Sequence, residues 1–294
     1  MTSATKRRRG LSAVLIALIL SAAPVRAADI ERTGGPYVPT PLAVVEQMLR
    51  MANVRESDYV IDLGSGDGVI VLTAARLYKA GGMGVDIDPD LVKLSNDKAI
   101  KMGVAERVRF AQQDVFKTDL SKATVLTLYL LPAMMLNLRT KIFSELKPGV
   151  RVVSHDYHFG DWRPDDGVTF DVPEKESITG VPAATVNLWV IPARVAGTWE
   201  VQVAGGETYE LALKQRFQTL EGMASSAAGK AIKPQYLTLR GNEFSFALPD
   251  ARGIARFSGR VQGSMIEGTV ELPGGRGAQP WTAVRTAAAK VITE

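Results

Sequence analysis

The spacing of apolar residues changes partway along the chain, and the two patterns predict two kinds of structure. Up to about residue 192, short apolar runs alternate with segments in which apolar residues recur every three or four positions. The runs predict buried strands, and the wider spacing predicts amphipathic helices. Strands are predicted at 59–63, 83–87, 107–111, 123–131, 150–156, 168–172 and 185–191, and helices at 41–53, 69–78, from Pro89 and from Pro132.

The order of these elements predicts an α/β fold. Strands alternate with helices and a strand pair follows, which is typical of a doubly wound parallel sheet with an antiparallel edge. The run at 123–131 is apolar enough to lie in the middle of that sheet. Proline suits the first turn of the helix that begins at Pro89, and we expect the apolar side of this helix to carry Leu91, Leu94 and Ile100.

Beyond residue 192 the apolar pattern has a period of two. Tyr209, Leu211 and Leu213 alternate with polar residues, and glycines separate similar short segments further on. Short strands at close spacing predict a small all-β domain, either a sandwich or a barrel, with room for one short helix near 220–230. Its Gly-Thr-Trp start resembles lipocalin-like barrels, and we expect both of its tryptophans, Trp199 and Trp281, to lie in its core.

The first 27 residues have the features of an export signal. Basic residues precede an apolar run, and small residues lead up to Ala27, which predicts a signal peptide cleaved after that residue. The apolar run is shorter than the ~20 residues that a membrane-spanning helix needs, so an uncleaved anchor is the alternative. We expect a periplasmic or secreted protein, or a membrane-anchored one, with membrane contact through the leader alone. The predicted divisions are a signal peptide at 1–27, a linker at 28–35, an α/β domain at 36–192 and a β-domain at 193–294.

Charge and composition argue against several kinds of function. The formal charge is +4, but residues 1–27 hold five basic residues and no acid, so the remainder carries −1. That balance predicts no nucleic-acid partner. The absence of cysteine excludes disulfides and thiolate chemistry, and the two histidines, His155 and His158, are too few for a multi-histidine metal centre. We expect both histidines to be structural or to contact substrate, and no metal to bind; the oligomeric state stays open.

The segment after the first strand is the main candidate for chemistry. Residues 60–75 read VIDLGSGDGVIVLTAA, so that a strand leads through Gly64, Gly66 and Gly68 directly into a helix. Glycines allow a tight turn and close approach of a ligand to the backbone, and the helix N-terminus directs free N–H groups toward it. The strand–turn–helix context is what makes this glycine spacing informative.

Acidic residues accompany this turn. Asp86 ends the second strand, 22 residues after Gly64, which is about the spacing at which a carboxylate binds a ribose diol. Asp114 follows the third strand, where it can accept a hydrogen bond from an adenine amino group. Asp67, inside the turn, would repel a pyrophosphate and is a candidate contact for a cation. S-adenosylmethionine (SAM) carries a sulfonium and an ammonium group, so these acids favour SAM over NAD.

The motifs DLGSGDG, GVDIDP and a later DVF resemble those of class I, seven-strand SAM-dependent methyltransferases. More narrowly, PYVPTPLAVVEQML, YLLPAMM and FGDWRPD resemble the small protein-lysine methyltransferase family that includes the mitochondrial ATP synthase c-subunit lysine methyltransferase. The resemblance covers about residues 36–165 and departs at Val69, where many members have arginine. It implies a Rossmann-like methyltransferase domain that uses SAM as its cofactor.

The resemblance also implies a role for each matching residue. Asp62, Gly64, Ser65, Gly66 and Gly68 would line the methionine part of SAM, Asp86 would hold the ribose, Asp114 and Val115 the adenine, and Tyr37, Val38 and Thr40 would close over the cofactor. The segment from Tyr129 to Pro132 lies where such enzymes present the acceptor nucleophile, which makes Tyr129 and Pro132 the candidate catalytic residues.

The expected reaction is an in-line displacement at the sulfonium methyl group, in which positioning and desolvation carry most of the catalysis. A lysine acceptor must first lose a proton, which an aromatic-lined pocket favours. Tyr129 with Tyr157 or Trp162 could form that lining, whereas Met134 and Met135 are expected in the core. A protein lysine is the favoured acceptor and a small molecule the nearest variant. The alternative is an exported, non-catalytic scaffold that acts through its β-domain.

Overall fold

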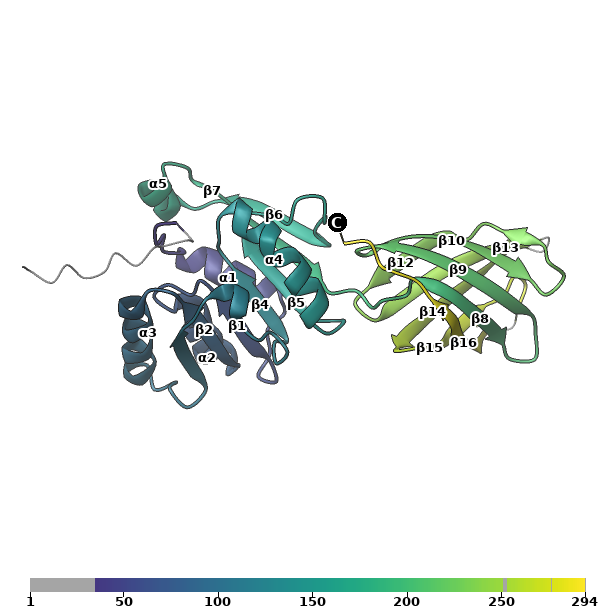
Figure 1. The fold of residues 1–294 in the computed structure, drawn as a ribbon, viewed down its shortest axis with the longest axis horizontal. Coiled ribbons are helices and arrows are strands. Elements are labelled where there is room, and N and C mark those ends of the chain that lie inside the picture. Colours follow the sequence, from purple (N-terminus) through teal and green to yellow (C-terminus); the bar gives the residue numbers. More distant parts are fainter. Residues whose placement is uncertain (1–34, 251–252, 276, 294) are drawn as a thin grey trace, which may run out of the picture. The chain divides into compact units, whose positions relative to one another are not determined.

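The computed structural model describes residues 35–250, 253–275 and 277–293. The predicted signal peptide and all but the last residue of the predicted linker lie outside the described residues. Two sheets hold the described strands, one on each side of residue 192 in the sequence (Figure 1). In the described part of the chain, no helix is both long and apolar enough to cross a membrane.

The first sheet is mixed, with an antiparallel edge. Its strands are β1 (Tyr59–Leu63), β2 (Gly81–Asp86), β3 (Val108–Gln112), β4 (Val125–Leu128), β5 (Arg151–His155), β6 (Asp166–Asp171) and β7 (Ala183–Val190). They lie in the order β3-β2-β1-β4-β5-β7-β6, parallel from β3 to β5, with β7 antiparallel to both of its neighbours. This arrangement confirms the predicted Rossmann-like fold, with β4 at the centre of the sheet.

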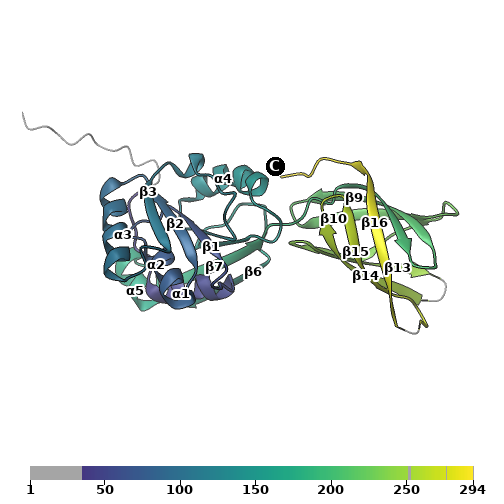
Figure 2. The same cartoon turned by 90° about the horizontal axis from the view of Figure 1, so that it is seen from below.

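Helices cover both faces of this sheet (Figures 1 and 2). They are α1 (Leu42–Met51), α2 (Val69–Tyr78), α3 (Pro89–Lys101), α4 (Pro132–Glu145) and α5 (Pro173–Thr179), with a 3₁₀ turn η1 (Val115–Lys117). Neighbouring residues of a strand point to opposite faces, so Val60 of β1 packs in the core with α1 and α2 while Ile61 packs with α4. Burial on both faces explains why the central strands are apolar at almost every position.

The inward face of α3 differs from the prediction. Leu94 is 43% exposed and Ile100 is 68% exposed, whereas the buried residues of α3 are Ser95 and Ala99. The small side chains allow the helix to lie close to the turn that precedes α2, and the Ser95 hydroxyl donates a hydrogen bond of 3.0 Å to the carbonyl of Gly66. The apolar periodicity therefore indicated the wrong face, because close packing selected small residues over large ones.

The second sheet is antiparallel and curls into a half-barrel. Its strands are β8 (Gly197–Val203), β9 (Thr208–Arg216), β10 (Thr219–Ser226), β11 (Ala231–Ile232), β12 (Gln235–Arg240), β13 (Glu243–Asp250), β14 (Gly253–Gln262), β15 (Met265–Glu271) and β16 (Ala278–Ala288). They lie in the order β11-β10-β9-β8-β16-β15-β14-β13-β12, and Figure 2 shows the curl. The all-β prediction is confirmed, with the barrel as the closer of its two alternatives. Trp199 and Trp281 are both buried in its core, as expected.

The short helix expected near 220–230 is absent from the structure, and most of that segment is strand β10. Its residues pair in continuous register with β9, from Thr219 opposite Arg216 to Ser226 opposite Tyr209. Leu220 and Ala224 lie against the half-barrel core. The local alanine- and serine-rich composition is overridden because pairing with β9 satisfies the backbone and buries one face of the segment.

The two sheets share part of one core. Phe217, in the turn between β9 and β10, is 3% exposed and belongs to the apolar cluster around α4. Its ring stacks on Trp162 with centroids 5.1 Å apart, and the Trp162 indole N–H donates to Gln218 at 2.9 Å. Trp162 is thus a core residue, which corrects its proposed place in an acceptor pocket. The predicted division between residues 192 and 193 falls between β7 and β8 and remains a prediction.

Replacing Phe217 with alanine should destabilise the protein, because a large buried ring that bridges both sheets would leave a cavity. Truncation of a buried aromatic side chain typically costs ~3–5 kcal/mol. Urea unfolding of Phe217→Ala and of the matched control Phe116→Ala, whose side chain is 38% exposed, measures the difference. Equal losses in the two variants would show that Phe217 does not join the sheets in solution.

Candidate active site

The turn between β1 and α2 depends on residues without a side chain. Gly64, Gly66 and Gly68 have φ angles of 76°, 52° and 80°, a left-handed region that other residues adopt only at a cost. A Cβ atom on Gly64 would lie 2.6 Å from the Leu130 side chain, and one on Gly66 would lie 2.5 Å from the ring of Tyr37. The bare backbone therefore lets the segments around Tyr37 and Leu130 lie directly over the turn.

Most of the residues singled out from the sequence line one cavity at the carboxyl ends of the parallel strands. They are Tyr37, Val38, Thr40, Asp62, Gly64, Ser65, Gly66, Asp67, Asp86, Asp114, Val115, Tyr129, Leu130 and Leu131. Gly68 and Pro132 are outside this lining. Gly68 is buried, where a Cβ atom would lie 2.8 Å from the ring of Phe110, and Pro132 is the exposed first residue of α4.

Sequence reasoning missed several residues of the lining. These are Gly35, Pro36, Val69, Ile70, Ile87, Asp88, Leu91 and Gln113. Ile87 and Gln113 adjoin the acids at the ends of β2 and β3, so their position next to Asp86 and Asp114 could have identified them as lining residues from the sequence. Leu91 faces the cavity instead of the core. Met134, expected in the core, lies both there and in the cavity wall, whereas Met135 is fully buried.

Asp86 connects the glycine turn to the end of β2. One carboxylate oxygen accepts a hydrogen bond of 2.8 Å from the backbone N–H of Gly66, and the other accepts one of 3.0 Å from the N–H of Asp88. Asp114 similarly accepts from the N–H of Phe116 at 2.9 Å and caps η1. Each carboxylate oxygen has further lone pairs, so both acids can accept hydrogen bonds from a ligand.

Asp62 is a buried acid, and no cation from residues 35–250, 253–275 or 277–293 pairs with it. Its side chain is 2% exposed, and the Thr127 hydroxyl donates a hydrogen bond of 2.7 Å to it. Burial, reinforced by the nearby charges of Asp86 and Asp67, raises the pKa of Asp62 to about 7. A positively charged group in the cavity would stabilise the ionised carboxylate, so the site has the electrostatic character that a sulfonium and an ammonium group require.

Asp67 lines the cavity and also has a cation partner within the protein. The Lys98 ammonium lies 2.6 Å from its carboxylate and offsets part of its charge, and its contact with a ligand remains a prediction. Among the described residues, neither Asp62 nor Asp86 forms an ion pair. The electrostatic preference for a cation therefore depends on these two acids.

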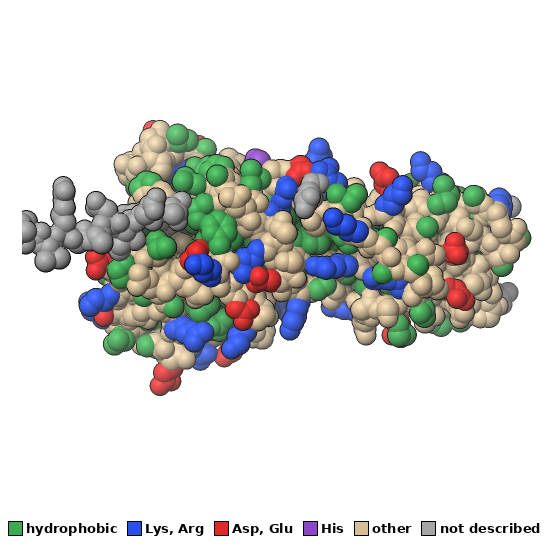
Figure 3. Space-filling model, in the orientation of Figure 1, with side chains coloured by type: hydrophobic (Ala, Val, Ile, Leu, Met, Phe, Trp, Pro, Cys, Tyr) green, Lys and Arg blue, Asp and Glu red, His purple; other side chains and the backbone are tan. Residues whose placement is uncertain are grey.

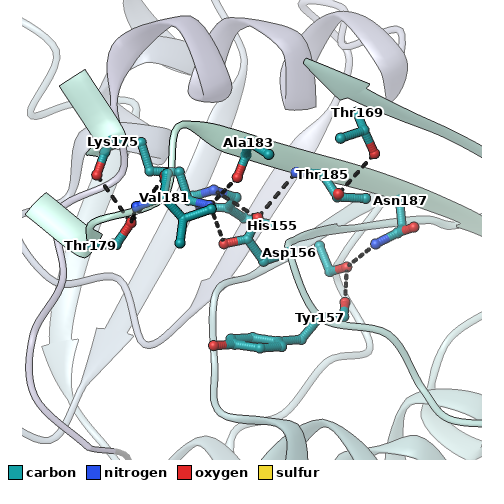
Figure 4. Close-up of polar contacts among 11 residues, drawn as sticks. His155, Asp156, Tyr157, Thr169, Lys175, Thr179, Val181, Ala183, Thr185 and Asn187 are labelled. Atoms are coloured by element: carbon teal, nitrogen blue, oxygen red, sulfur yellow. Dashed lines mark hydrogen bonds and ion pairs between the residues drawn. The ribbon is translucent and has the colours of Figure 1, made fainter. Parts of the chain in front are cut away.

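Aromatic side chains form the wall of the cavity that follows β4 and β5. Tyr129 and Tyr157 line it with stacked rings whose centroids are 6.3 Å apart. His155 lies behind Tyr129, with ring centroids 4.0 Å apart, and is 1% exposed (Figure 4 shows its surroundings). Burial lowers the pKa of His155 to about 4 and, with the charge of Asp156, raises that of Tyr129 to about 12. Both rings are therefore neutral at physiological pH.

The residues present fit SAM. Within the described part of the chain, the buried Ser65 hydroxyl in the glycine turn has no hydrogen-bond partner and Asp62 has no positive partner. SAM offers polar groups and positive charge to both, and its ribose and adenine have acceptors in Asp86 and Asp114. The assignment of each residue to a part of SAM remains a prediction.

Comparisons with known proteins agree with this geometry. The ANTKMT methyltransferase domain family matches residues 62–166. A protein-lysine N-methyltransferase of Saccharolobus islandicus (strain REY15A) is 42% identical over 130 residues, 44% of this chain and 81% of that protein. The ATP synthase c-subunit lysine N-methyltransferase of Xenopus laevis is 34% identical over 156 residues, 53% of this chain and 68% of that protein.

Among solved structures, a crystal structure of an RNA methyltransferase from Salinibacter ruber in complex with S-adenosyl-L-homocysteine is 48% identical in sequence. The match covers 54% of this chain and 96% of the solved chain, with a TM-score of 0.48. The family match ends at residue 166, before the second sheet begins.

The sheet order, the glycine turn and the acids at the ends of the first strands define a class I, SAM-dependent methyltransferase. Within that class, the chain belongs to the family of protein-lysine N-methyltransferases that includes the ATP synthase c-subunit enzymes.

SAM affinity should fall as the pH is lowered through 7, because a cation binds the ionised form of Asp62 and protonation removes that charge. With a pKa of about 7 in the free protein, the affinity should drop about tenfold between about pH 8 and pH 6. Calorimetry across this pH range measures the dissociation constant of SAM. The matched variant Asp62→Asn carries no titrating group there, and any titration of SAM itself is common to both proteins. Identical pH profiles would contradict the role of Asp62.

Proposed function

We propose that the methyl acceptor is the side-chain amine of a lysine in a protein. The observation that carries this proposal is the aromatic wall formed by Tyr129 and Tyr157 beside the cofactor cavity. An aromatic, apolar wall beside the transferred methyl group suits the alkyl chain and the uncharged amine of a lysine. The relatives from S. islandicus and X. laevis are both lysine N-methyltransferases by name, which supports the same acceptor class.

The distribution of charge along the cavity supports an amine that arrives uncharged. All the acids of the lining lie in or just after β1, β2 or β3: Asp62, Asp67, Asp86, Asp88 and Asp114. The lining after β4 and β5 is aromatic and apolar, so it disfavours an ammonium ion and promotes loss of its proton to solvent. SAM supplies a methyl group on a positively charged sulfur. The chain's own residues hold the acceptor nitrogen in line with that methyl group and keep water away.

Other acceptors compete with this proposal less well. A small-molecule amine would suit the same aromatic wall, but the relatives from S. islandicus and X. laevis are lysine N-methyltransferases by name. A nucleic-acid acceptor would be favoured by a continuous basic surface. On the face drawn in Figure 3, basic and acidic side chains are interspersed over the part of the chain built on the first sheet. A non-catalytic scaffold would have no need of an intact glycine turn together with Asp62 and Asp86.

Full-length protein incubated with methyl-labelled SAM should label poly-L-lysine, and mass spectrometry should place the methyl group on the side-chain nitrogen. The matched variant Asp86→Ala should lose most of this activity and most of the stabilisation by SAM, which amounts to ~2.7 kcal/mol at one hundred times the dissociation constant. Label on RNA with none on poly-L-lysine would overturn the acceptor proposal. Stabilisation by SAM without labelling of any acceptor would favour the scaffold.

We further propose that the leader directs the enzyme out of the cytosol, by cleavage after Ala27 or as an anchor. The proposal is supported by the basic and apolar segments of residues 1–27. Export has a chemical consequence, because SAM is made in the cytosol. Unless SAM is supplied outside, a protein that is exported folded with SAM bound completes a single turnover.

Fractionation and intact mass of the native protein test this proposal directly. Cleavage predicts a chain that starts at Ala28 in the periplasmic or extracellular fraction, and an anchor predicts the full-length chain in the membrane fraction. Full-length protein in the cytosolic fraction would rule out both forms of export.

A further inference from the structure

Asp156 connects the two aromatic residues that flank Tyr129. It directly follows His155, the last residue of β5, and directly precedes Tyr157 of the cavity lining. The rings of these two neighbours lie 4.0 Å and 6.3 Å from the Tyr129 ring, centroid to centroid. Asp156 itself is not part of the lining. The backbone conformation at this one residue therefore decides whether both rings can reach Tyr129.

That conformation is unusual. Asp156 has a φ angle of +62°, in the left-handed region that is unfavourable for a residue with a side chain. The Tyr157 N–H donates to the carbonyl of His155 at 2.8 Å, so Asp156 is the central residue of a tight three-residue turn at the end of β5. This turn sets the direction in which the Tyr157 ring leaves the strand, and the rings of both neighbours lie near Tyr129. Such a conformation persists only where its surroundings impose it.

Contacts from β7 and α5 hold Asp156 in its left-handed conformation (Figure 4). The Asp156 N–H donates to the carbonyl of Thr185 at 2.6 Å, and the Thr185 N–H donates back to the Asp156 carboxylate at 3.0 Å. The second carboxylate oxygen lies 2.9 Å from the ammonium of Lys175. Thr185 belongs to β7 and Lys175 to α5, so two separate elements hold the side chain of one residue.

Lys175 makes the arrangement hard to relax. It is 5% exposed, and its ammonium also donates to the carbonyl of Ala183. Removing the carboxylate would leave a buried positive charge without a partner, which is strongly unfavourable. Asp156 thus has a fixed conformation, a fixed side chain and a position directly behind the aromatic wall.

We propose that Asp156, held by Lys175 and Thr185, is a positioning residue that sets the aromatic wall against which the methyl acceptor binds. That the acceptor is an amine rests on the proposed function, whereas the placement of the two rings by Asp156 is independent of it. Asp156 acts through Tyr129 and Tyr157, so its loss affects the acceptor and spares the cofactor.

Steady-state kinetics with poly-L-lysine test the proposal in the full-length protein. Asp156→Ala should lower kcat/KM for poly-L-lysine about tenfold or more through misplacement of the wall, with the SAM dissociation constant unchanged. Asparagine tolerates left-handed backbone and can still accept from Thr185, although it loses the ion pair with Lys175, so Asp156→Asn should retain clearly more activity than Asp156→Ala. Lys175→Gln should fall between them. The control Asp171→Ala, at an exposed position on β6, should have no effect.

A measurement without any acceptor separates this proposal from the identity of the acceptor. The chain has two histidines, so the imidazole NMR signals of His155 are resolved and assigned with His158→Gln. In the wild type, the Tyr129 ring should displace the His155 signals from ordinary histidine values, and Asp156→Ala should abolish that displacement while Asp156→Asn keeps it.

Unchanged His155 signals in Asp156→Ala would overturn the positioning role. So would equal losses of SAM affinity and of kcat/KM, which indicate general damage. If the wild type does not methylate poly-L-lysine, the proposed function fails, and the NMR measurement still decides the role of Asp156.

Discussion

The active site depends on a turn that only glycine can form. Gly64 and Gly66 adopt left-handed backbone between β1 and α2, and at both positions the space for a side chain is taken by another residue. Asp86 then fixes the turn through the Gly66 N–H. The cavity, its acids and the segment around Tyr37 are all placed relative to this turn, so any added Cβ atom would displace several parts of the site at once.

Charge in the cavity is divided between two regions. The cofactor region holds buried acids, and Asp62 is the extreme case because its pKa rises to about 7 when no cation is present. The proposed acceptor region holds no acid and is lined by the aromatic rings of Tyr129 and Tyr157. This division suits a reaction in which a positively charged donor meets an uncharged nucleophile, since each region favours the charge state that its ligand needs.

The second sheet is more than an appended module. Phe217 of the β9–β10 turn completes the apolar cluster that contains Trp162, and Gln218 accepts the Trp162 indole hydrogen. Trp162 follows the acceptor wall closely in sequence, so the half-barrel helps to hold the chain that leads away from Tyr157. Methyl transfer itself needs no such addition, and the contact gives the second sheet a structural role in this protein.

The local sequence pattern alone determined the alternating α/β order, the glycine turn and the positions of Asp62, Asp86 and Asp114. Apolar periodicity and glycine spacing identify the elements, and the topology of a parallel sheet brings the ends of its strands to one edge of the sheet. The same pattern indicated the wrong face of α3, a helix where β10 lies, and an acceptor-pocket role for Trp162. In each case a contact with another element decided: the Gly66 turn, strand β9 and Phe217. The pairing of Asp67 with Lys98 was likewise not visible in the sequence. Only the tertiary structure could reveal these pairings, since packing and charge compensation depend on which residues meet in space.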